Sequence, residues 1–388
     1  MSDSLFSQNR IAEAHFMVVG CGALGNEVLK NLILFGARHI VIVDFDQVEV
    51  GNLSRSIFYR KEDADKGRRK VEVMAERLCL LAPELELITI DGDIAYDVPL
   101  GLIRRMDVVI GCVDSRWARY CINRLCMRGG IPWVDGGISQ LEGTVRVFVP
   151  GSNCYACNLG AEGLRQIYRR MPCSGTIRQA EGAGHAPTTP IIASVIGAVE
   201  VQEALKIIHQ DALREGEFTS LCGRMFYFEG QHLSSRVVSF TAYDDDCPVH
   251  ECWQPIESIP IGTKQTVGDL LAFLRQHYEA TEVSFSLIDD CFVDFIADRE
   301  TDVITTVMCL GRDVAAFVDE TASLKGKPLS AFYQHEYRDI NVGFPFQQLC
   351  LAQIGLKLWD VIPVRIDGRR VYVELEKTDK QISHNKCN

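Results

Sequence analysis

The sequence predicts a doubly wound, mostly parallel α/β sheet followed by a smaller α+β domain. Apolar runs of strand length alternate with segments of helical periodicity, and a Gly-x-Gly-x-x-Gly loop joins the first strand to the next helix. The regular alternation stops after residue 255, where the elements become short and irregular. We therefore expect a nucleotide-binding domain at residues 1–255 and a C-terminal α+β domain of unknown role at residues 256–388.

The expected elements of the first domain follow one another in chain order. Residues 1–15 should form a short helix before the first strand. The runs that predict strands cover residues 16–19, 39–44, 87–90, 106–112, 131–134 and 144–149. The segments that predict helices cover residues 26–34, 70–81 and 189–208. The remaining expectations are a long loop at residues 160–187 and a hairpin formed by residues 225–228 and 236–240.

Composition limits the kinds of partner. The chain has 388 residues, 47% of them apolar and 24% charged, which is typical of a globular protein with a large core. Its net charge of -12 repels phosphate backbones, so we expect no nucleic-acid partner. No apolar run approaches the roughly 20 residues that span a bilayer, and no signal-peptide core is visible. We expect a cytoplasmic protein without membrane contact, whose 15 cysteines are thiols or metal ligands rather than a disulfide framework.

The glycine loop and a following acid predict a nucleotide site. Gly20, Gly22 and Gly25 lie where a strand passes into a helix, so the backbone can approach a phosphate at the helix N-terminus. Asp44 ends the next strand, where a carboxylate can accept hydrogen bonds from ribose hydroxyls. These residues alone also fit an NAD site in an oxidoreductase. A further alternative is that the glycines serve only close helix–strand packing.

Cationic and polar residues beyond Asp44 favour a triphosphate over a dinucleotide. Asn52, Arg55 and Lys70 follow the second strand, and cations there would neutralise phosphate charge during attack at the α-phosphorus. Asp114 and Ser115 follow the fourth strand, at the carboxyl edge of the sheet where ligands bind. A carboxylate beside phosphates is expected to hold Mg²⁺.

These segments resemble the ubiquitin-activating-enzyme superfamily, which includes the adenylyltransferases MoeB and ThiF of molybdopterin and thiamin synthesis. The resemblance covers residues 16–208 closely. The matching segments are VVGCGALGNEVLKNLILFGARHIVIVDFDQVEVGNLSR, KGRRKVEV, CVDSRWARYCINRLC and CYAC. It implies a Rossmann-like ThiF fold, bound ATP, and Mg²⁺ organised by Asp114, with Ser115 near the adenine. The residues that it assigns to the phosphates and ribose are Gly20, Gly22, Gly25, Asp44, Asn52, Arg55 and Lys70.

Two cysteine knuckles predict a zinc site. Cys154 and Cys157 form a C-x-x-C pair, and Cys247 opens a second knuckle about ninety residues later. Four soft ligands from two knuckles suit tetrahedral Zn²⁺. We expect Cys252 to be the fourth ligand because sulfur is softer than nitrogen, with His250 as the alternative. The superfamily has the same two-knuckle zinc, and unligated thiols are the remaining possibility.

Cys173 is the candidate nucleophile. It lies in the irregular segment near Arg169, Arg170 and Arg178, whose charges would lower the pKa of a thiol. The segment resembles the crossover loop of the SUMO-activating catalytic subunit, which implies a thioester between this cysteine and a modifier. A loop thiol without a catalytic role is the alternative.

The expected function is therefore activation of a ubiquitin-like protein: ATP-dependent adenylation of its C-terminal carboxylate, then transfer to Cys173. The alternatives are a sulfur-carrier adenylyltransferase of the MoeB/ThiF type without an essential thioester, a peptide adenylyltransferase, an NAD-dependent oxidoreductase and a silent scaffold. The superfamily also implies a homodimer. The C-terminal domain could bind the modifier or a conjugating enzyme, by analogy with the ubiquitin-fold domain of larger relatives, or could serve dimerisation or capping.

Overall fold

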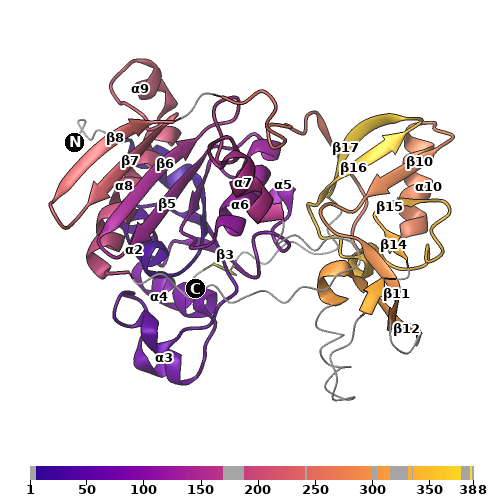
Figure 1. Ribbon diagram of the computed structural model, residues 1–388, viewed down its shortest axis with the longest axis horizontal. Helices are drawn as coiled ribbons and strands as arrows, with labels where there is room; N and C mark the ends of the chain where they lie inside the picture. The colour runs from indigo at the N-terminus through magenta and orange to yellow at the C-terminus, as the bar shows by residue number, and fades with distance from the viewer. Residues whose placement is uncertain are drawn as a thin grey trace. The chain divides into compact units, whose positions relative to one another are not determined.

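The computed structural model describes residues 6–168, 188–240, 243–298, 304–314, 331–333, 335–376 and 385–386. The chain divides into two compact units (Figure 1). Among the described residues, the first unit contains 6–164, 188–252 and 385–386, and the second contains 165–168, 253–298, 304–314, 331–333 and 335–376. Each unit has a sheet and a hydrophobic core of its own.

The first unit is built on a nine-stranded sheet. Its spatial order is β18-β3-β2-β1-β4-β5-β6-β7-β8. The five strands from β3 to β5 run parallel, whereas β6, β7, β8 and β18 join antiparallel. The predicted doubly wound α/β fold is confirmed. The strands are β1 (His15–Val19), β2 (His39–Asp44), β3 (Glu86–Asp91), β4 (Val108–Gly111), β5 (Trp133–Ser139), β6 (Glu142–Phe148), β7 (Arg224–Glu229), β8 (Ser234–Ser239) and β18 (Asn385–Lys386).

Both faces of the parallel strands are covered, which explains why the sequence shows continuous apolar runs there. In β1, Phe16 and Val18 enter the core shared with α2, α4 and α8, while Met17 is fully buried on the opposite face. The helix α6 packs on β4 and β5. The helices of this unit's chain segments are α1 (Gln8–Glu13), α2 (Ala23–Leu34), α3 (Lys61–Asp65), α4 (Lys70–Leu81), α5 (Leu100–Ile103), α6 (Arg116–Gly129), α8 (Pro190–Ile208) and α9 (Gln210–Arg214).

The long helix α8 begins where its sequence places an N-cap. The Thr189 hydroxyl accepts the Ile192 N–H, and Pro190 occupies the first turn, where its missing N–H costs nothing. Apolar side chains of α8 pack against α2 and against β4, β5 and β6. Helix α8 therefore covers strands β4, β5 and β6 on one face of the sheet.

One local prediction was wrong. Residues 160–168, expected to begin a long loop, form helix α7 (Gly160–Tyr168). The glycines at 160 and 163 hide the helical signal, but Ile167 is buried and Leu164 lies one turn before it. The predicted hairpin of β7 and β8 is present.

The second unit is a small α+β module. Its five-stranded sheet has the order β15-β10-β16-β17-β9, and β12, β11 and β13 form a separate sheet to which β14 adds. Helix α10 (Val267–His277) begins with a Thr266–Asp269 capping box and packs into this unit's core. Its strands are β9 (Ile256–Ile259), β10 (Val283–Ser286), β11 (Phe292–Asp298), β12 (Ile304–Leu310), β13 (Ala331–Tyr333), β14 (Glu336–Tyr337), β15 (Asp339–Asn341), β16 (Val361–Ile366) and β17 (Arg369–Leu375). None of the helices in the described ranges has the length and apolar character needed to cross a membrane.

Candidate functional site

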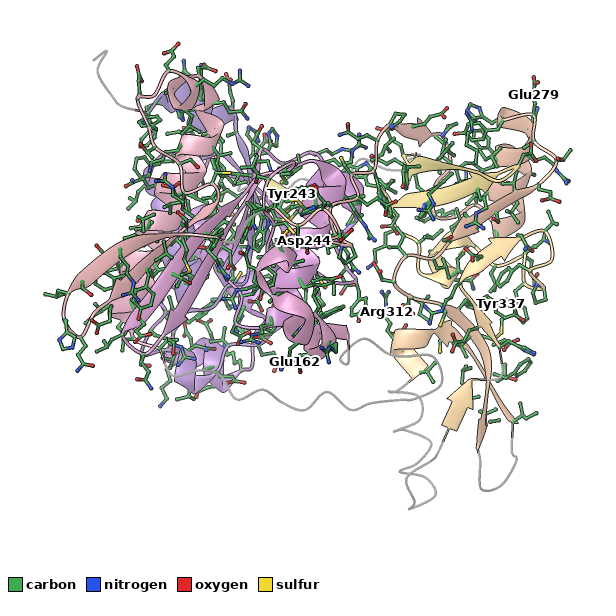
Figure 2. The ribbon with its side chains drawn as sticks, turned by 45° about the horizontal axis from the view of Figure 1, so that its top comes forward. Glu162, Tyr243, Asp244, Glu279, Arg312 and Tyr337 are labelled. Carbon is green, nitrogen blue, oxygen red and sulfur yellow. The ribbon has the colours of Figure 1, made fainter. Side chains whose placement is uncertain are left out.

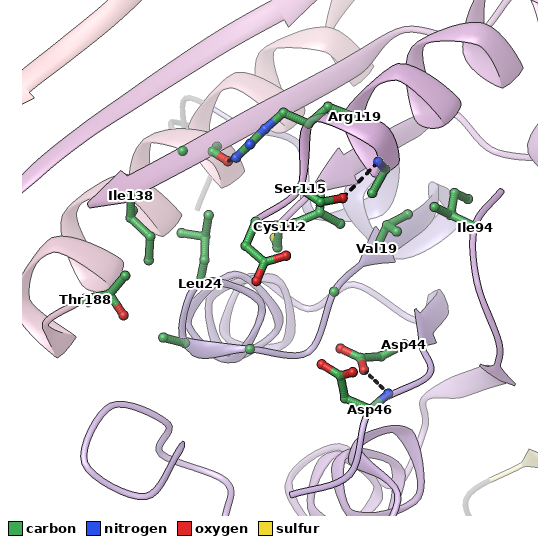
Figure 3. A pocket seen from close by; sticks show the side chains of 18 of the residues that line it. Val19, Leu24, Asp44, Asp46, Ile94, Cys112, Ser115, Arg119, Ile138 and Thr188 are labelled. Carbon is green, nitrogen blue, oxygen red and sulfur yellow. Dashed lines mark hydrogen bonds between the residues drawn. The ribbon is translucent and has the colours of Figure 1, made fainter. Parts of the chain in front are cut away.

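A cavity of about 500 Å³ opens at the carboxyl ends of the parallel strands of the first unit (Figure 3). Its wall combines the glycine loop, the end of β2, the segment between β4 and α6, and parts of β5 and β6. The sequence-predicted residues that line it are Gly20, Gly22, Asp44, Asn52, Arg55, Lys70, Asp114 and Ser115. The structure thus brings eight of the nine candidate nucleotide residues to one cavity.

The ninth residue, Gly25, supports the loop instead of lining the cavity. A Cβ atom at Gly25 would lie 1.9 Å from the Gly20 carbonyl oxygen. Gly20 has φ +98°, and a Cβ there would lie 2.5 Å from the Cys112 carbonyl oxygen. Nothing lies within 4 Å of a Cβ at Gly22, which is the N-cap of α2. The loop can therefore present the free N–H groups of α2 to a phosphate.

An ion-pair network closes the end of β2. The Asp44 carboxylate accepts the Cys21 N–H at 2.6 Å and the Asp46 N–H at 2.8 Å, which fixes its orientation. The Lys70 ammonium donates to Asp46 at 2.7 Å. Burial raises the pKa of Asp44, and Lys70 opposes this shift. Burial lowers the pKa of Lys70, but Asp44 and Asp46 outweigh it and the net shift is upward, so Lys70 stays charged. Asp46 was missed by the sequence analysis.

The loop after β2 supplies an amide and a guanidinium. Asn52 is buried, and its side-chain oxygen accepts the Glu49 N–H at 2.9 Å, which holds the loop. The Arg55 N–H donates to the Asn52 carbonyl at 3.1 Å. Among the described residues, the Arg55 guanidinium has no carboxylate partner, so a cation faces the cavity uncompensated.

Asp114 and Ser115 lie on the opposite wall, between β4 and α6. The Ser115 hydroxyl caps α6 by accepting the Ala118 N–H at 3.0 Å, so its first role is to fix that helix. Asp114 precedes this cap and lines the cavity, and its carboxylate oxygens are of the type that Mg²⁺ prefers.

A cluster of two arginines and one aspartate, which the sequence analysis missed, completes the cavity wall. Asp135 is fully buried and accepts the Arg119 Nε–H at 2.8 Å, and it also pairs with Arg146. Both arginines line the cavity. Burial lowers the pKa of Arg119, but Asp135 outweighs it and the net shift is upward. Part of this cluster is a cross-strand pair of opposite charges, because Asp135 on β5 lies directly opposite Arg146 on β6. Such a pair is the signal by which the cluster could have been found.

These groups give the cavity the chemistry of a phosphate and carboxylate site. Arg55 and Lys70 lie on the side of the glycine loop, and Arg119 and Arg146 belong to the other wall. The Asp114 carboxylate lines the same cavity, and its oxygens are ligands of the kind that a divalent cation prefers. This set can neutralise charge that develops on a phosphoryl group while a second anion approaches it.

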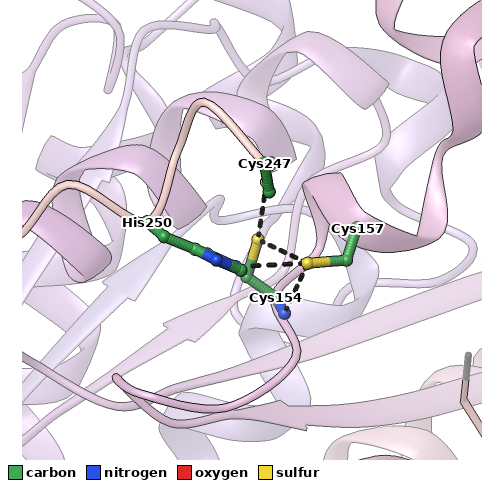
Figure 4. Close-up of side chains that lie close together, drawn as sticks. All are labelled: Cys154, Cys157, Cys247 and His250. Atoms are coloured by element: carbon green, nitrogen blue, oxygen red, sulfur yellow. Dashed lines mark hydrogen bonds between the residues drawn. The ribbon is translucent and has the colours of Figure 1, made fainter. Parts of the chain in front are cut away.

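The two cysteine knuckles meet at a second site of the first unit (Figure 4). The ligand atoms of Cys154, Cys157, Cys247 and His250 all lie within 4.8 Å of one another. The sulfur of Cys154 lies 3.6 Å from that of Cys157 and 3.8 Å from that of Cys247. Tetrahedral zinc with Zn–S bonds of about 2.3 Å requires sulfur separations of about 3.8 Å. The donor set and its spacing therefore fit a structural zinc ion.

His250, not Cys252, stands with the three cysteines. The His250 Nε2 lies 3.1 Å from the Cys157 sulfur, whereas Cys252 is exposed and its sulfur lies 3.8 Å from the Arg128 carbonyl oxygen. The physical reason is a turn in which the His250 N–H donates to the Cys247 carbonyl, so that these two side chains face the same way. The Tyr243 ring, labelled in Figure 2, stacks on the His250 imidazole at 4.2 Å. The expectation of Cys252 as fourth ligand is corrected accordingly.

The candidate nucleophile Cys173 lies outside the described residues, as do Arg169, Arg170 and Arg178. Its role stays a prediction.

Comparison with protein families gives one match that covers the site. The family model described as "ThiF family" matches residues 3–249, which is more than half of the chain. This span contains the whole lining of the cavity and three of the four residues of the cysteine–histidine cluster.

Named relatives match the same part of the chain. The SAMP-activating enzyme E1 of Haloferax volcanii is 28% identical over 242 residues, 62% of this chain and 82% of that protein. The adenylyltransferase and sulfurtransferase MOCS3 of Mus musculus is 30% identical over 243 residues, 62% of this chain and 48% of that protein. The chain thus matches about half the length of the mouse relative. Among solved structures, E. coli MccB with ATP is similar at a TM-score of 0.48, with 20% identity over 63% of this chain and 68% of that one.

Proposed function

This chain belongs to the ThiF family, and we propose that it is an ATP-dependent adenylyltransferase whose substrate is the C-terminal carboxylate of a ubiquitin-like or sulfur-carrier protein. The observation that carries the proposal is the cavity wall, where Arg55 and Lys70 accompany the glycine loop and Asp114. A dinucleotide site has no need of these cations, which argues against an NAD-dependent oxidoreductase. A triphosphate with a divalent cation uses all of them.

The chemistry follows from these positions. The phosphates lie against the N–H groups at the start of α2, and Asp44 accepts hydrogen bonds from the ribose. The carrier carboxylate attacks the α-phosphorus and pyrophosphate leaves, forming an acyl-adenylate. Arg55 and Lys70 neutralise the charge that develops on the phosphoryl oxygens, so the reaction needs positioning and electrostatics only. Mg²⁺, for which Asp114 is the fitting ligand, would supply further neutralisation of the phosphates.

Arg119 and Arg146 are suited to receive the incoming carboxylate. They line the wall formed by α6, β5 and β6, across from the glycine loop. Asp135 neutralises one of the two positive charges and holds both guanidinium groups in place. One positive charge is left to attract the carrier carboxylate.

The second step is transfer of the carrier to Cys173 as a thioester. The cysteine sulfur attacks the acyl carbon of the adenylate and AMP leaves. The alternative is a sulfur-carrier adenylyltransferase that stops at the acyl-adenylate or passes it to a sulfur donor. The two relatives described above support both outcomes, since one is named an activating enzyme E1 and the other an adenylyltransferase and sulfurtransferase. A peptide could also take the place of the carrier protein.

The zinc ion is proposed to be structural. Cys154 and Cys157 follow β6, and Cys247 and His250 follow the β7–β8 hairpin, so a shared metal would join segments about ninety residues apart. All four ligand positions come from protein side chains, which leaves no open coordination site for a reaction.

The proposed adenylation also implies protein partners. We propose a cytoplasmic homodimer in which the second unit binds the carrier or a conjugating enzyme; a dimerisation or capping role is the alternative. Light scattering of the full chain tests the dimer, with an expected mass of twice 43.4 kDa. A mass of one chain contradicts it.

The test of the function uses the full chain, Mg·ATP and candidate carriers that end in Gly-Gly. The proposal expects carrier-dependent exchange between ATP and pyrophosphate, together with a thiol-sensitive adduct on non-reducing gels. The adduct should vanish in Cys173→Ala and persist in Cys222→Ala, a control at a cysteine with a free thiol. Exchange without an adduct would establish the sulfur-carrier alternative, and no exchange with any carrier or peptide would refute adenylation.

A further inference from the structure

A buried acid lies behind the cavity wall. Glu200, on α8, is fully buried. No side chain among the residues that the structure describes forms a hydrogen bond with either oxygen of its carboxyl group. Glu203, one turn later on the same helix, is also buried but pairs with Lys206 and accepts the Leu221 N–H at 2.9 Å. Glu200 is therefore the buried acid of this helix to which no described side chain is paired, and such a group calls for an explanation.

Glu200 is in direct contact with the site. A Cβ atom built on Gly136 would lie 2.4 Å from the carboxyl carbon of Glu200, so the carboxyl group fills the space beside the Gly136 backbone. Gly136 lines the cavity, and its carbonyl oxygen accepts a hydrogen bond from Arg119 at 3.0 Å. One residue of β5 thus separates the Glu200 carboxyl group from the arginine cluster.

The surroundings of Glu200 disfavour its ionised form. Burial raises the pKa of Glu200 well above its ordinary value, and the charge of Asp135 raises it further. Arg119 and the Gly136 backbone act in the opposite direction. Burial and Asp135 prevail, so the neutral form of the Glu200 carboxyl group is favoured compared with an ordinary glutamic acid.

The protonation state of Glu200 sets the net charge of the Arg119–Asp135–Arg146 cluster together with the carboxyl group beside it. With Glu200 neutral, the two guanidinium groups of Arg119 and Arg146 and the carboxylate of Asp135 sum to one positive charge. With Glu200 ionised, the same groups sum to zero, and the new carboxylate competes with any anion in the cavity for the arginines.

We propose that Glu200 is a positioning residue for adenylation: as a neutral carboxylic acid behind Gly136, it leaves the Arg119–Asp135–Arg146 cluster with one positive charge for the carrier carboxylate. This inference rests on the proposed adenylation. Glu200 acts through the cluster and does not touch the substrate.

Other titratable groups around α8 are accounted for. On α2, Glu27 pairs with Lys30, and at the end of β4 the buried Cys112 has a pKa raised by burial first and by Glu200 among its neighbours. The charged residues on the remaining elements packed against α8 are Asp135 on β5, Glu142 and Arg146 on β6, Arg10 and Glu13 on α1, and Asp211 and Arg214 on α9. Of these, Asp135 is the group that acts on Glu200.

The test compares Glu200→Gln with the wild type and with Glu203→Gln. Carrier-dependent exchange is measured from mildly acidic to mildly alkaline pH, with kcat and KM for the carrier separated. In the wild type, KM should rise about tenfold for each pH unit above the pKa of Glu200. Glu200→Gln should keep the low wild-type KM at every pH, because its amide cannot ionise. Glu203→Gln should keep the wild-type pH dependence. A KM that rises with pH equally in Glu200→Gln and the wild type overturns the proposal, as does a high KM of folded Glu200→Gln at all pH values. A low KM of both proteins over the whole pH range agrees with a carboxyl group that stays neutral.

A spectroscopic measurement separates this inference from the proposed function. The infrared difference spectrum of the wild type minus Glu200→Gln at neutral pH should contain the carbonyl stretch of one protonated carboxylic acid. Its absence overturns the proposal even where adenylation is found. If the wild type shows no exchange with any carrier, the proposed function is refuted, and so is the role assigned to Glu200. The infrared band still reports whether the Glu200 carboxyl group is protonated.

Discussion

Replacing Lys70 with methionine should separate phosphate binding from folding. Lys70 is buried, and its ammonium donates to Asp46 and faces Asp44, so the variant removes one cation from the triphosphate side of the cavity. Loss of one preorganised charge of this kind lowers turnover by about 10²–10³, or about 3–4 kcal/mol of transition-state stabilisation. Breaking a fully buried pair would destabilise by about 3–5 kcal/mol. Because the Asp46 side chain is 39% exposed, we expect about 1–3 kcal/mol.

The assay for Lys70→Met is carrier-dependent ATP–pyrophosphate exchange, with urea unfolding measured on the same samples. Lys66→Met is the matched control, since Lys66 is exposed and does not line the cavity. The control should keep both activity and stability. An exchange rate of Lys70→Met within about threefold of the wild type would refute the reasoning. Removal of a residue that neutralises triphosphate charge should lower this rate by far more.

Three further predictions concern the metal cluster, the glycine loop and the second unit. In metal analysis, His250→Ala should lose bound zinc, and it should melt at a lower temperature. Cys252→Ser should keep the zinc content of the wild type. Loss of zinc in Cys252→Ser would contradict the corrected ligand set. In chemical denaturation, Gly25→Ala should lower the free energy of unfolding by about 2–4 kcal/mol, because its Cβ would overlap the Gly20 carbonyl oxygen. The control Gly22→Ala should lower it by less than about 1 kcal/mol, which is the size of a helix-cap change. Burial raises the pKa of Asp360 to about 6, so its contribution to stability is present below the ordinary carboxyl pKa and is lost as pH rises through about 6. The free energy of unfolding should fall by about 3 kcal/mol over this range, and Asp360→Asn should flatten the fall when unfolding is followed against pH.

Much of the first unit could be predicted because its signals are local. Strand β2 at His39–Asp44 and helix α4 at Lys70–Leu81 coincide with the expected ranges, since a strand buried on both faces is a continuous apolar run and a helix at the sheet surface keeps its periodicity. The glycine loop and Asp44 were also visible, because their spacing along the chain follows from the strand–helix–strand unit itself.

The parts that could not be predicted depend on contacts between distant segments. The choice of His250 over Cys252 is made by one turn after Cys247, which ligand softness alone does not reveal. The role of Asp135 requires the register of β5 on β6 and the position of Arg119 on α6. Burial of Glu200 behind Gly136 likewise appears only once α8 is packed on the sheet.

The central claim is that the cavity binds a nucleoside triphosphate through cations of the loop after β2. Calorimetric titration of Mg·ATP and of NAD into the wild type, Arg55→Ala and the control Lys66→Ala tests it most directly. The account predicts that Mg·ATP binds the wild type and the control alike, binds Arg55→Ala about ten- to a hundredfold more weakly, and is not displaced by NAD. Tighter binding of NAD than of ATP, or equal ATP affinity of Arg55→Ala and the wild type, would contradict it.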